Sequence, residues 1–192
     1  MHIQRLEHVD PLTLYAVVRE EGRDPFMLES RTKEGSRARY TYISSDPAYT
    51  VEIGDDGTYV DGSYLSSERN PFRALKSLHE GHVDGEGFVG GFVGYAAYDS
   101  VHADIGGHIA EPSCFGFYPR VFAYDHAHDT LTYRCLHGHE RHDVDGIVAE
   151  APAFTTAENQ ATEQAAQIQN LILQGFDAIV LNAASPTAFD AL

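Results

Sequence analysis

The hydrophobic and polar positions of this chain fall into short blocks, and the first long block predicts a helix. Residues 10–21, DPLTLYAVVREE, begin with Asp10, a residue type whose carboxylate caps helix N-termini. Pro11 follows at the first helical position, which suits proline because the N–H there has no intrahelical partner. We therefore predict a short helix over these residues.

A second helix is predicted over residues 70–79, NPFRALKSLH. Its apolar residues Phe72, Leu75 and Leu78 recur every three positions, which is typical of one buried helix face. A third helix is predicted over residues 157–174, which are rich in Ala, Gln and Glu and carry a regular apolar stripe.

Six further blocks combine β-branched, aromatic and apolar residues in the way that is typical of strands. The first block, residues 26–28, is predicted to be a buried strand that ends at Glu29-Ser30. One block contains an Asp-Gly turn, and two others are separated by a short polar loop that predicts a hairpin. The six blocks are residues 26–28, 39–44, 58–64, 114–126, 130–136 and 178–181.

The order of these elements indicates the fold class. The strands are grouped along the chain, and the regular strand–helix alternation of a doubly wound sheet is missing. We therefore expect an α+β fold with mainly antiparallel sheets and flanking helices. Residues 140–156 are polar and acidic and include Pro152, so we expect a surface loop or linker there.

The segment 87–101, GFVGGFVGYAAYDSV, is rich in glycine and invites comparison with phosphate-binding loops. It lacks the lysine of a GxxxxGK loop and the acidic residue expected after a GxGxxG turn. The favoured interpretation is structural, because glycines let neighbouring elements approach closely. The interleaved aromatic residues are then expected to fill the core, namely Phe88, Phe92, Tyr95 and Tyr98.

The charge balance narrows the classes of partner. The 192 residues carry 13 Lys and Arg against 29 Asp and Glu, a formal net charge of −16. Such a surface repels phosphate backbones and anionic lipids, so we expect no nucleic-acid and no membrane partner. No apolar run reaches about 18 residues, the length of a membrane span. The N-terminus also lacks the apolar stretch of a signal peptide, so we expect a cytoplasmic protein.

The distribution of the charge points to a halophilic host. Acidic residues are spread through the chain, and Lys33 and Lys76 are its only lysines. This pattern suits a cytosol of very high salt, where the Debye length falls to about 3 Å near 1 M and carboxylate repulsion is screened. The alternative is an ordinary acidic protein.

Two cysteines, Cys114 and Cys135, are too few for a disulfide scaffold. Both lie in predicted strands, and the expected hairpin register does not place them opposite each other. We therefore expect free thiols buried in the structure.

Several of the eleven histidines gather with acidic residues in a tract of a kind that can bind zinc or nickel. Because the tract is polar and lacks a supporting apolar shell, the favoured interpretation is a solvated surface. The tract consists of His137, His139, His142, Asp143 and Asp145, with His126 and His128 at the neighbouring hairpin end.

Charged and hydroxyl groups meet at the predicted ends of two strands. Glu29 could accept hydrogen bonds from an ammonium group, Ser30 could donate to a carboxylate, and Arg39 could clamp that carboxylate in bidentate fashion. These three groups supply the chemistry that holds a zwitterionic amino acid. The alternative is a turn with ordinary surface polar groups.

Four segments, in order, resemble the N-terminal half of the large subunit of anthranilate synthase and related chorismate-using enzymes. Each segment is short, and their order over residues 26–126 carries the resemblance. FMLES at 26–30 resembles the family's LLES, ARYTYI at 38–43 with DP at 46–47 resembles GRYSFIG…DP, GGFVGYAAYD at 90–99 resembles GGxVGYxxYD/E, and FYPRVFAYDH at 117–126 resembles a strand ending in DH.

This resemblance implies a part of anthranilate synthase component I, a lyase of tryptophan biosynthesis that converts chorismate to anthranilate. It also implies the family's feedback site for tryptophan, which the LES segment and the neighbouring strand help to form. The residues that match those segments are Leu28, Glu29, Ser30, Arg39 and Tyr40.

The family's chorismate site, its Mg²⁺-binding glutamates and its catalytic histidine lie in a C-terminal domain that these residues do not include. The resemblance implies that residues 1–150 form the N-terminal domain. Residues 151–192 would then be a linker, a helix and the truncated start of the chorismate-binding domain. We expect no catalytic residue, no metal site and no cofactor in this chain, with Mg²⁺ belonging to the complete enzyme, and no turnover of chorismate by the chain alone.

The resemblance also implies partners. L-tryptophan is the expected small-molecule ligand, and a chorismate-binding catalytic chain and a glutamine amidotransferase subunit are the expected protein partners. Two alternatives stay open. One is a fragment of aminodeoxychorismate synthase component I, although the sister enzymes more often carry aspartate where this chain has Glu29. The other is a stand-alone, non-catalytic amino-acid-binding module.

Overall fold

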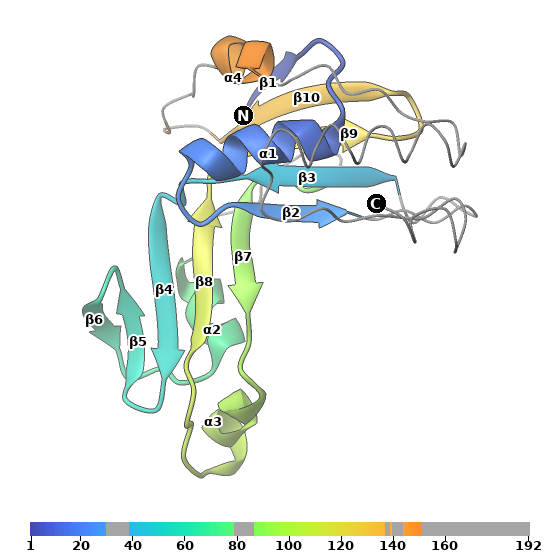
Figure 1. Ribbon diagram of the computed structural model, residues 1–192. Coiled ribbons are helices and arrows are strands. Elements are labelled where there is room, and N and C mark those ends of the chain that lie inside the picture. Colours follow the sequence, from blue (N-terminus) through green and yellow to red (C-terminus); the bar gives the residue numbers. More distant parts are fainter. Residues whose placement is uncertain (30–38, 79–86, 137–138, 140–143, 151–192) are drawn as a thin grey trace, which may run out of the picture. The chain divides into compact units, whose positions relative to one another are not determined.

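The computed structural model of the protein describes residues 1–29, 39–78, 87–136, 139 and 144–150 (Figure 1). They belong to one compact unit, Met1–Pro152, and the second unit, Ala153–Leu192, falls outside the described residues. The described elements are β1 (His2–Arg5), α1 (Pro11–Glu21), β2 (Phe26–Glu29), β3 (Tyr40–Ser44), β4 (Tyr49–Gly54), β5 (Gly57–Val60), β6 (Ser63–Ser66), α2 (Pro71–Leu78), β7 (Gly91–Tyr95), the 3₁₀ helix η1 (Tyr98–Val101), α3 (His102–Ile105), β8 (Ser113–Tyr118), β9 (Arg120–Asp125), β10 (Thr130–Cys135) and α4 (Val144–Glu150).

The described strands form two antiparallel sheets of five strands each. The first sheet has the order β1-β10-β9-β3-β2, and the second has the order β6-β5-β4-β8-β7. Few helices accompany them, so the predicted α+β class with mainly antiparallel sheets is confirmed (Figure 1).

The chain passes between the sheets twice, from β3 to β4 and from β8 to β9. The second passage corrects the prediction of one strand over residues 114–126, because Pro119 divides that block into β8 and β9. Proline has no N–H to donate to a strand ladder, which makes it a natural break. Its carbonyl accepts from the N–H of Leu136 at 2.8 Å.

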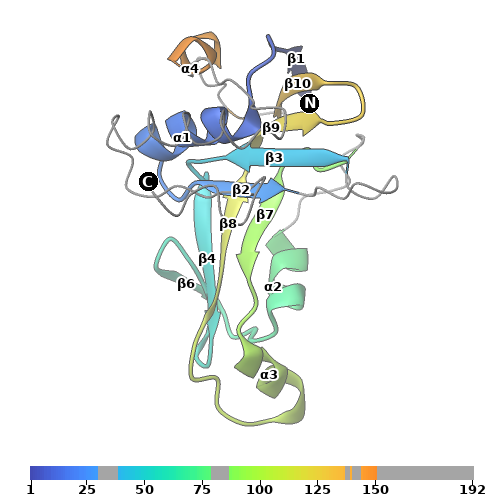
Figure 2. The ribbon, with the colours of Figure 1, turned by 45° about the vertical axis from the view of Figure 1, so that its right-hand side comes forward.

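Helix α1 covers one face of the first sheet (Figure 2). The Asp10 carboxylate caps it as predicted, accepting from the N–H groups of Leu12 at 3.0 Å and Thr13 at 3.2 Å. Leu14 and Val18 are buried against the sheet in the main core. Together with Ile43, Phe122, Tyr124, Leu131 and Tyr133, they form the apolar interior that fixes α1 on this face.

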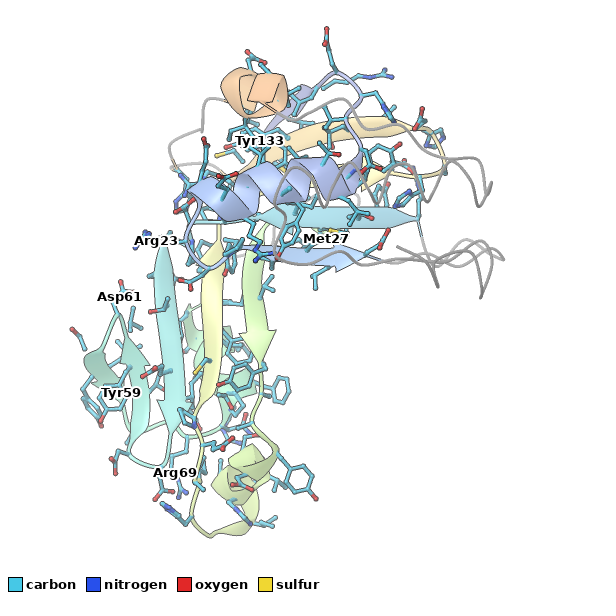
Figure 3. All side chains as sticks on the ribbon, in the orientation of Figure 1. Arg23, Met27, Tyr59, Asp61, Arg69 and Tyr133 are labelled. Atoms are coloured by element: carbon cyan, nitrogen blue, oxygen red, sulfur yellow. The ribbon has the colours of Figure 1, made fainter. Side chains whose placement is uncertain are left out.

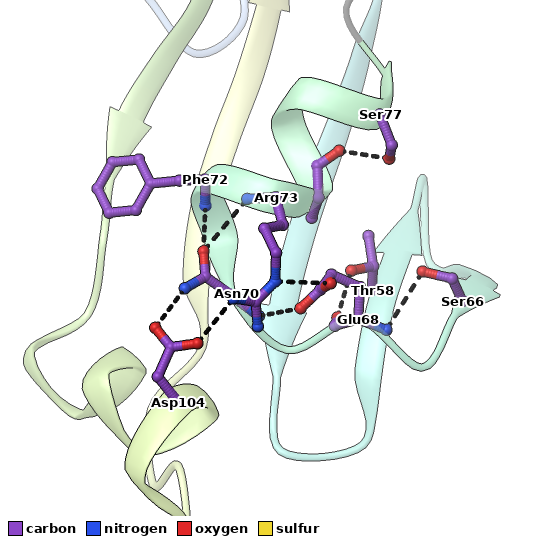
Figure 4. A network of polar contacts seen from close by, with 9 residues as sticks. Thr58, Ser66, Glu68, Asn70, Phe72, Arg73, Ser77 and Asp104 are labelled. Carbon is purple, nitrogen blue, oxygen red and sulfur yellow. Dashed lines mark hydrogen bonds and ion pairs between the residues drawn. The ribbon is translucent and has the colours of Figure 1, made fainter.

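Helix α2 is confirmed, but its buried face differs from the predicted one at Phe72. Asn70 caps the helix by accepting from the N–H groups of Phe72 and Arg73 at 3.0 and 3.2 Å (Figure 4). Phe72 is 71% exposed, whereas Ala74 is buried. A helix turns 100° per residue, so residues six positions apart lie 120° apart and cannot share one narrow face. The face that packs is formed by Ala74 with the predicted Leu75 and Leu78, so only Phe72 departs from the prediction.

The glycine-rich segment is structural, as predicted, although half of its aromatic residues are not in the core. A Cβ atom at Gly94 would lie 2.1 Å from the carbonyl oxygen of Cys114, so only glycine allows β7 to approach β8 this closely. Phe92 packs against the second, smaller core. Tyr95 and Tyr98 are 57% and 94% exposed, which contradicts their predicted burial. Tyr98 begins a short helical excursion instead of continuing the strand.

The Asp-Gly turn predicted within residues 58–64 is confirmed. It joins β5 to β6, and Asp61 and Gly62 both have positive φ, of 47° and 74°. That backbone matches a tight hairpin turn whose twist suits antiparallel strands.

Other predictions about the chain are corrected or lie outside the described residues. Strand β2 is present but lies at the edge of its sheet, so Leu28 is exposed instead of buried, while Glu29 is exposed as expected for the polar end of the strand. Within the predicted linker 140–156, the helix α4 buries Val144 against the first core. The predicted helix 157–174 and strand 178–181 lie outside the described residues. No helix among the described residues is long and apolar enough to cross a membrane.

Candidate functional site

The predicted amino-acid site falls where β2 ends beside the start of β3. The antiparallel register pairs Leu28 with Tyr42 and Glu29 with Thr41. Figure 3 shows this edge of the first sheet next to the labelled Met27. Ser30 lies outside the described residues. The fold therefore brings Leu28 and Glu29 next to the strand that begins at Tyr40.

The pleat of the sheet divides these residues between two faces. Successive side chains of a strand point to opposite faces, and directly paired residues share a face. Leu28 therefore lies on the same face as Tyr40 and Tyr42, whereas Glu29 lies on the face of Thr41. Leu28 is 48% exposed, so the face with the two tyrosines presents an apolar contact to solvent. Glu29, at the last position of an edge strand, is exposed at the border of the other face.

Arg39 is held by a carboxylate of the same chain. Its Nε donates to both oxygens of Asp125 at 2.9 and 3.0 Å, and a terminal nitrogen donates to one of them at 2.6 Å. His128 Nδ1 lies 3.2 Å from that nitrogen and 2.8 Å from Asp125. Hydrogen bonds from Arg39 hold the pKa of the Asp125 carboxyl far below its usual range, against the opposing effect of burial.

The ring of Tyr40 lies between two guanidinium groups. The central carbon of Arg39 is 4.8 Å from the ring centroid, and that of Arg134 is 5.7 Å away. Tyr40 also stacks on Tyr42, with 5.6 Å between centroids. Cations over an aromatic face are stabilised by the quadrupole of the ring. Because Arg134 is buried and Arg39 is paired with Asp125, the arrangement is an aromatic surface held by two guanidinium groups.

The residues around this surface are fixed by the segment that precedes β7. The Tyr42 hydroxyl accepts from the N–H of Phe88 at 3.0 Å, and Arg134 donates to the carbonyl of Phe88 at 3.0 Å. Sequence reasoning assigned no role to Asp125 or Arg134. A signal was available for Asp125, because a carboxylate at the end of a strongly apolar strand needs a cationic partner.

Two histidines of the predicted tract, His126 and His128, form hydrogen bonds within the first sheet. His128 bonds to Asp125, and His126 Nε2 lies 2.8 Å from the hydroxyl of Thr41, so both rings take part in the hydrogen bonding of the first sheet. Among the described residues, no group of three or more His, Cys, Asp or Glu side chains is arranged to hold a metal ion. His137, His142 and Asp143 lie outside those residues. Both cysteines are free, as predicted, but only Cys135 is buried as expected, whereas Cys114 is half-buried.

Comparison with known proteins identifies the relatives of this chain. No protein-family model matches it. The anthranilate synthase component 1 of Thermococcus kodakarensis is 53% identical over 133 residues, which are 69% of this chain and 30% of the relative. This chain is a relative of the N-terminal part of anthranilate synthase component I.

Further relatives carry the same name. The anthranilate synthase component 1 of Archaeoglobus fulgidus is 45% identical over 124 residues, 65% of this chain and 28% of the relative. A crystal structure of anthranilate synthase component I from Streptococcus pneumoniae TIGR4 aligns with a TM-score of 0.44 and 18% identity, covering 100% of this chain and 40% of that one. The chain thus spans about 30% of the length of the Thermococcus kodakarensis relative.

Proposed function

We propose that this chain is the regulatory and scaffold part of an anthranilate synthase component I and that it binds L-tryptophan as the feedback ligand. The observation that supports this most is the 53% identity over 133 residues to an enzyme component of that name. The proposed site is formed by Leu28, Glu29, Ser30, Arg39 and Tyr40, which lie on β2, β3 and the residues that flank them.

Each described member of the site has a proposed role. The exposed Leu28 and the ring of Tyr40, on one face of the sheet, give the indole an apolar and aromatic surface. Arg39 supplies positive charge for the ligand carboxylate while Asp125 holds its orientation. Glu29 reaches the ammonium group around the edge of β2. A carboxylate, a guanidinium and an apolar surface are the groups that a zwitterion with an aromatic side chain requires.

The chemistry of the whole enzyme is assigned to other chains or regions. In this proposal, chorismate is converted to anthranilate by a chorismate-binding catalytic region, which also holds Mg²⁺, with ammonia from a glutamine amidotransferase subunit. The relatives named above are all anthranilate synthases, which favours this activity over aminodeoxychorismate synthesis.

Titration calorimetry of the folded chain with L-tryptophan in multimolar KCl tests the site. We expect saturable binding of L-tryptophan and at least tenfold weaker binding of D-tryptophan, because the enantiomer cannot place ammonium, carboxylate and indole on the same three groups (about 1.4 kcal/mol). Glu29→Gln should weaken binding, while Glu52→Gln, which removes an exposed carboxylate from β4, should not. Absence of heat from a protein that is folded by circular dichroism would reject the tryptophan site.

A separate assay tests the division of labour. The purified chain with chorismate, ammonia and Mg²⁺ should produce no anthranilate fluorescence. Fluorescence that rises in proportion to the chain concentration would contradict the assignment of catalysis to another region. A chain that binds tryptophan but restores neither anthranilate nor aminodeoxychorismate synthesis to a catalytic region would instead favour the stand-alone module.

A further inference from the structure

A cavity of about 350 Å³ lies where β3 ends, at the opposite end of that strand from the proposed tryptophan site. Its walls come from four parts of the chain: the end of α1, the residues that follow β3, the start of β9 with the facing part of β10, and α4. Figure 3 labels Tyr133, which lines this cavity, and Arg23, which lies beside its rim. Small-molecule pockets range from about 300 to 1,000 Å³, so this cavity suits a ligand the size of an amino acid.

The lining is apolar on the side of the sheet and helices. Val18, Val121, Phe122 and Tyr133 line the cavity and are all less than 5% exposed. Ile147 of α4 also lines the cavity and packs against the first core. An apolar group that enters the cavity would therefore be removed from water on several sides, which favours its binding.

The rim is polar and is fixed by hydrogen bonds. Asp46 accepts from the N–H of Arg23 at 3.1 Å and donates its own N–H to the carbonyl of Arg23 at 2.8 Å. The Ser45 hydroxyl donates to the other oxygen of the Asp46 carboxylate at 2.8 Å. Arg120 donates to the carbonyl of Asp46 at 2.9 Å. The rim therefore needs little ordering when a ligand binds, which lowers the entropic cost of binding.

Charges of both signs line the same cavity. Glu21 ends α1, and its carboxylate adds to the partial negative charge of the helix C-terminus. Asp46 adds a second carboxylate, which also forms an ion pair with the Nε of Arg23 at 3.6 Å, and Arg120 brings a guanidinium to the cavity wall. A cation is therefore attracted near the helix end and an anion near Arg120, while an apolar group fits the floor.

We propose that this cavity binds a free amino acid with an apolar side chain, at a site distinct from that of tryptophan. The ammonium group lies toward Glu21 and Asp46, the carboxylate lies toward Arg120, and the side chain occupies the apolar floor. The proposal rests on the cavity and its lining and does not depend on the proposed function.

Titration calorimetry in multimolar KCl with L-phenylalanine and L-leucine tests the site. We expect saturable binding of at least one of them, and binding at least about tenfold weaker for 2-phenylethylamine, which lacks the carboxylate. Ile147→Trp should abolish binding by filling the cavity from α4, and Arg120→Gln should weaken it. Circular dichroism confirms that each variant is folded. Tyr40→Ala, in the proposed tryptophan site, is the matched control and should leave this binding unchanged.

The outcomes separate the two proposals. Failure of both amino acids to bind the folded protein overturns the second site, whatever the result with tryptophan. Binding that survives Ile147→Trp, or that is lost in Tyr40→Ala, also overturns it, because the ligand then lies elsewhere. Loss of tryptophan binding in Tyr40→Ala with phenylalanine or leucine binding retained supports two separate sites.

Discussion

At the scale of single residues, the pairing of Arg39 with Asp125 organises the candidate site. The two side chains are 29% and 11% exposed, so neither charge is fully hydrated. A carboxylate this far from water is stable only with hydrogen-bond donors, and Arg39, His128 and the N–H of Ala127 provide them. The same pairing fixes the guanidinium over the ring of Tyr40.

Asp125→Asn tests this pairing. The amide keeps the shape of the side chain but removes the charge that Arg39 contacts, so we expect the free energy of unfolding at pH 7 to fall by about 1–3 kcal/mol. Urea unfolding in constant KCl measures it. Asp56→Asn, at an exposed position in the turn between β4 and β5, is the matched control and should change stability little.

The lowered pKa of Asp125 determines how the stability difference between the wild type and Asp125→Asn depends on pH. The unfolded chain binds the proton at the ordinary pKa of about 3.9, whereas the folded chain binds it only at lower pH. The stabilisation is therefore complete above the unfolded pKa and is lost as pH falls through the folded one. The gap between wild type and Asp125→Asn should narrow below about pH 5. A gap that widens in acid would contradict the ion pair.

Part of the site could be predicted from sequence and part could not. Glu29, Arg39 and Tyr40 stand at ends of predicted strands, so local patterns placed them near one another. The partner of Arg39 lies 86 residues away, and its proximity depends on β9 pairing with β3. That pairing follows from strand order in the sheet, which a local pattern does not specify.

At the scale of elements, tight contacts between backbones decide which strands can pair. A Cβ atom added at Gly94 of β7 would lie 2.1 Å from the carbonyl oxygen of Cys114 and 2.6 Å from the Cα of Phe115. Both atoms belong to backbone, which cannot move aside as a flexible side chain could. Gly54 of β4 is different, because its nearest neighbour would be a Pro112 side-chain atom at 3.7 Å.

This contrast gives a matched pair of variants. Gly94→Ala forces β7 away from β8, and we expect a loss of about 1–3 kcal/mol in the free energy of unfolding, as for other overpacked sites. Gly54→Ala meets only ordinary van der Waals contact and should be close to neutral. Urea denaturation of both variants under one set of conditions measures the difference. Equal stability of the two variants would show that β7 does not lie against β8 as described.

Elements with local signals were predictable, and those that depend on distant contacts were less so. Helix α1 was found from Asp10 and Pro11, and the turn at Asp61-Gly62 was found from its dipeptide. The division of residues 114–126 between two sheets was missed, because strand propensity continues on both sides of Pro119. Helix α4 was missed because it has only seven residues and contains Gly146, a residue type that disfavours helices, so it depends on packing against the first core.

At the scale of the whole molecule, charge repulsion and exposed apolar surface act together. The formal net charge is −16 for 192 residues, so carboxylate repulsion opposes compaction in dilute buffer. Large apolar side chains are exposed on and near the second sheet, with Phe72 and Ile105 at 71% and Tyr98 at 94%. Burial of such groups by added partners or domains would be favourable.

The charge predicts how stability depends on salt. The melting temperature should rise from dilute buffer to multimolar KCl, and most of the rise should occur below about 1 M, where the Debye length has shortened to about 3 Å. A general strengthening of apolar burial by an excluded solute would instead continue to increase with concentration. Thermal unfolding followed by circular dichroism in a KCl series, with a parallel sucrose series of equal osmolality, separates the two effects. Screening is confirmed if KCl gives a steep early rise and sucrose a shallow steady one. A melting temperature that is flat or falls with KCl would refute both the screening argument and the predicted adaptation to high salt.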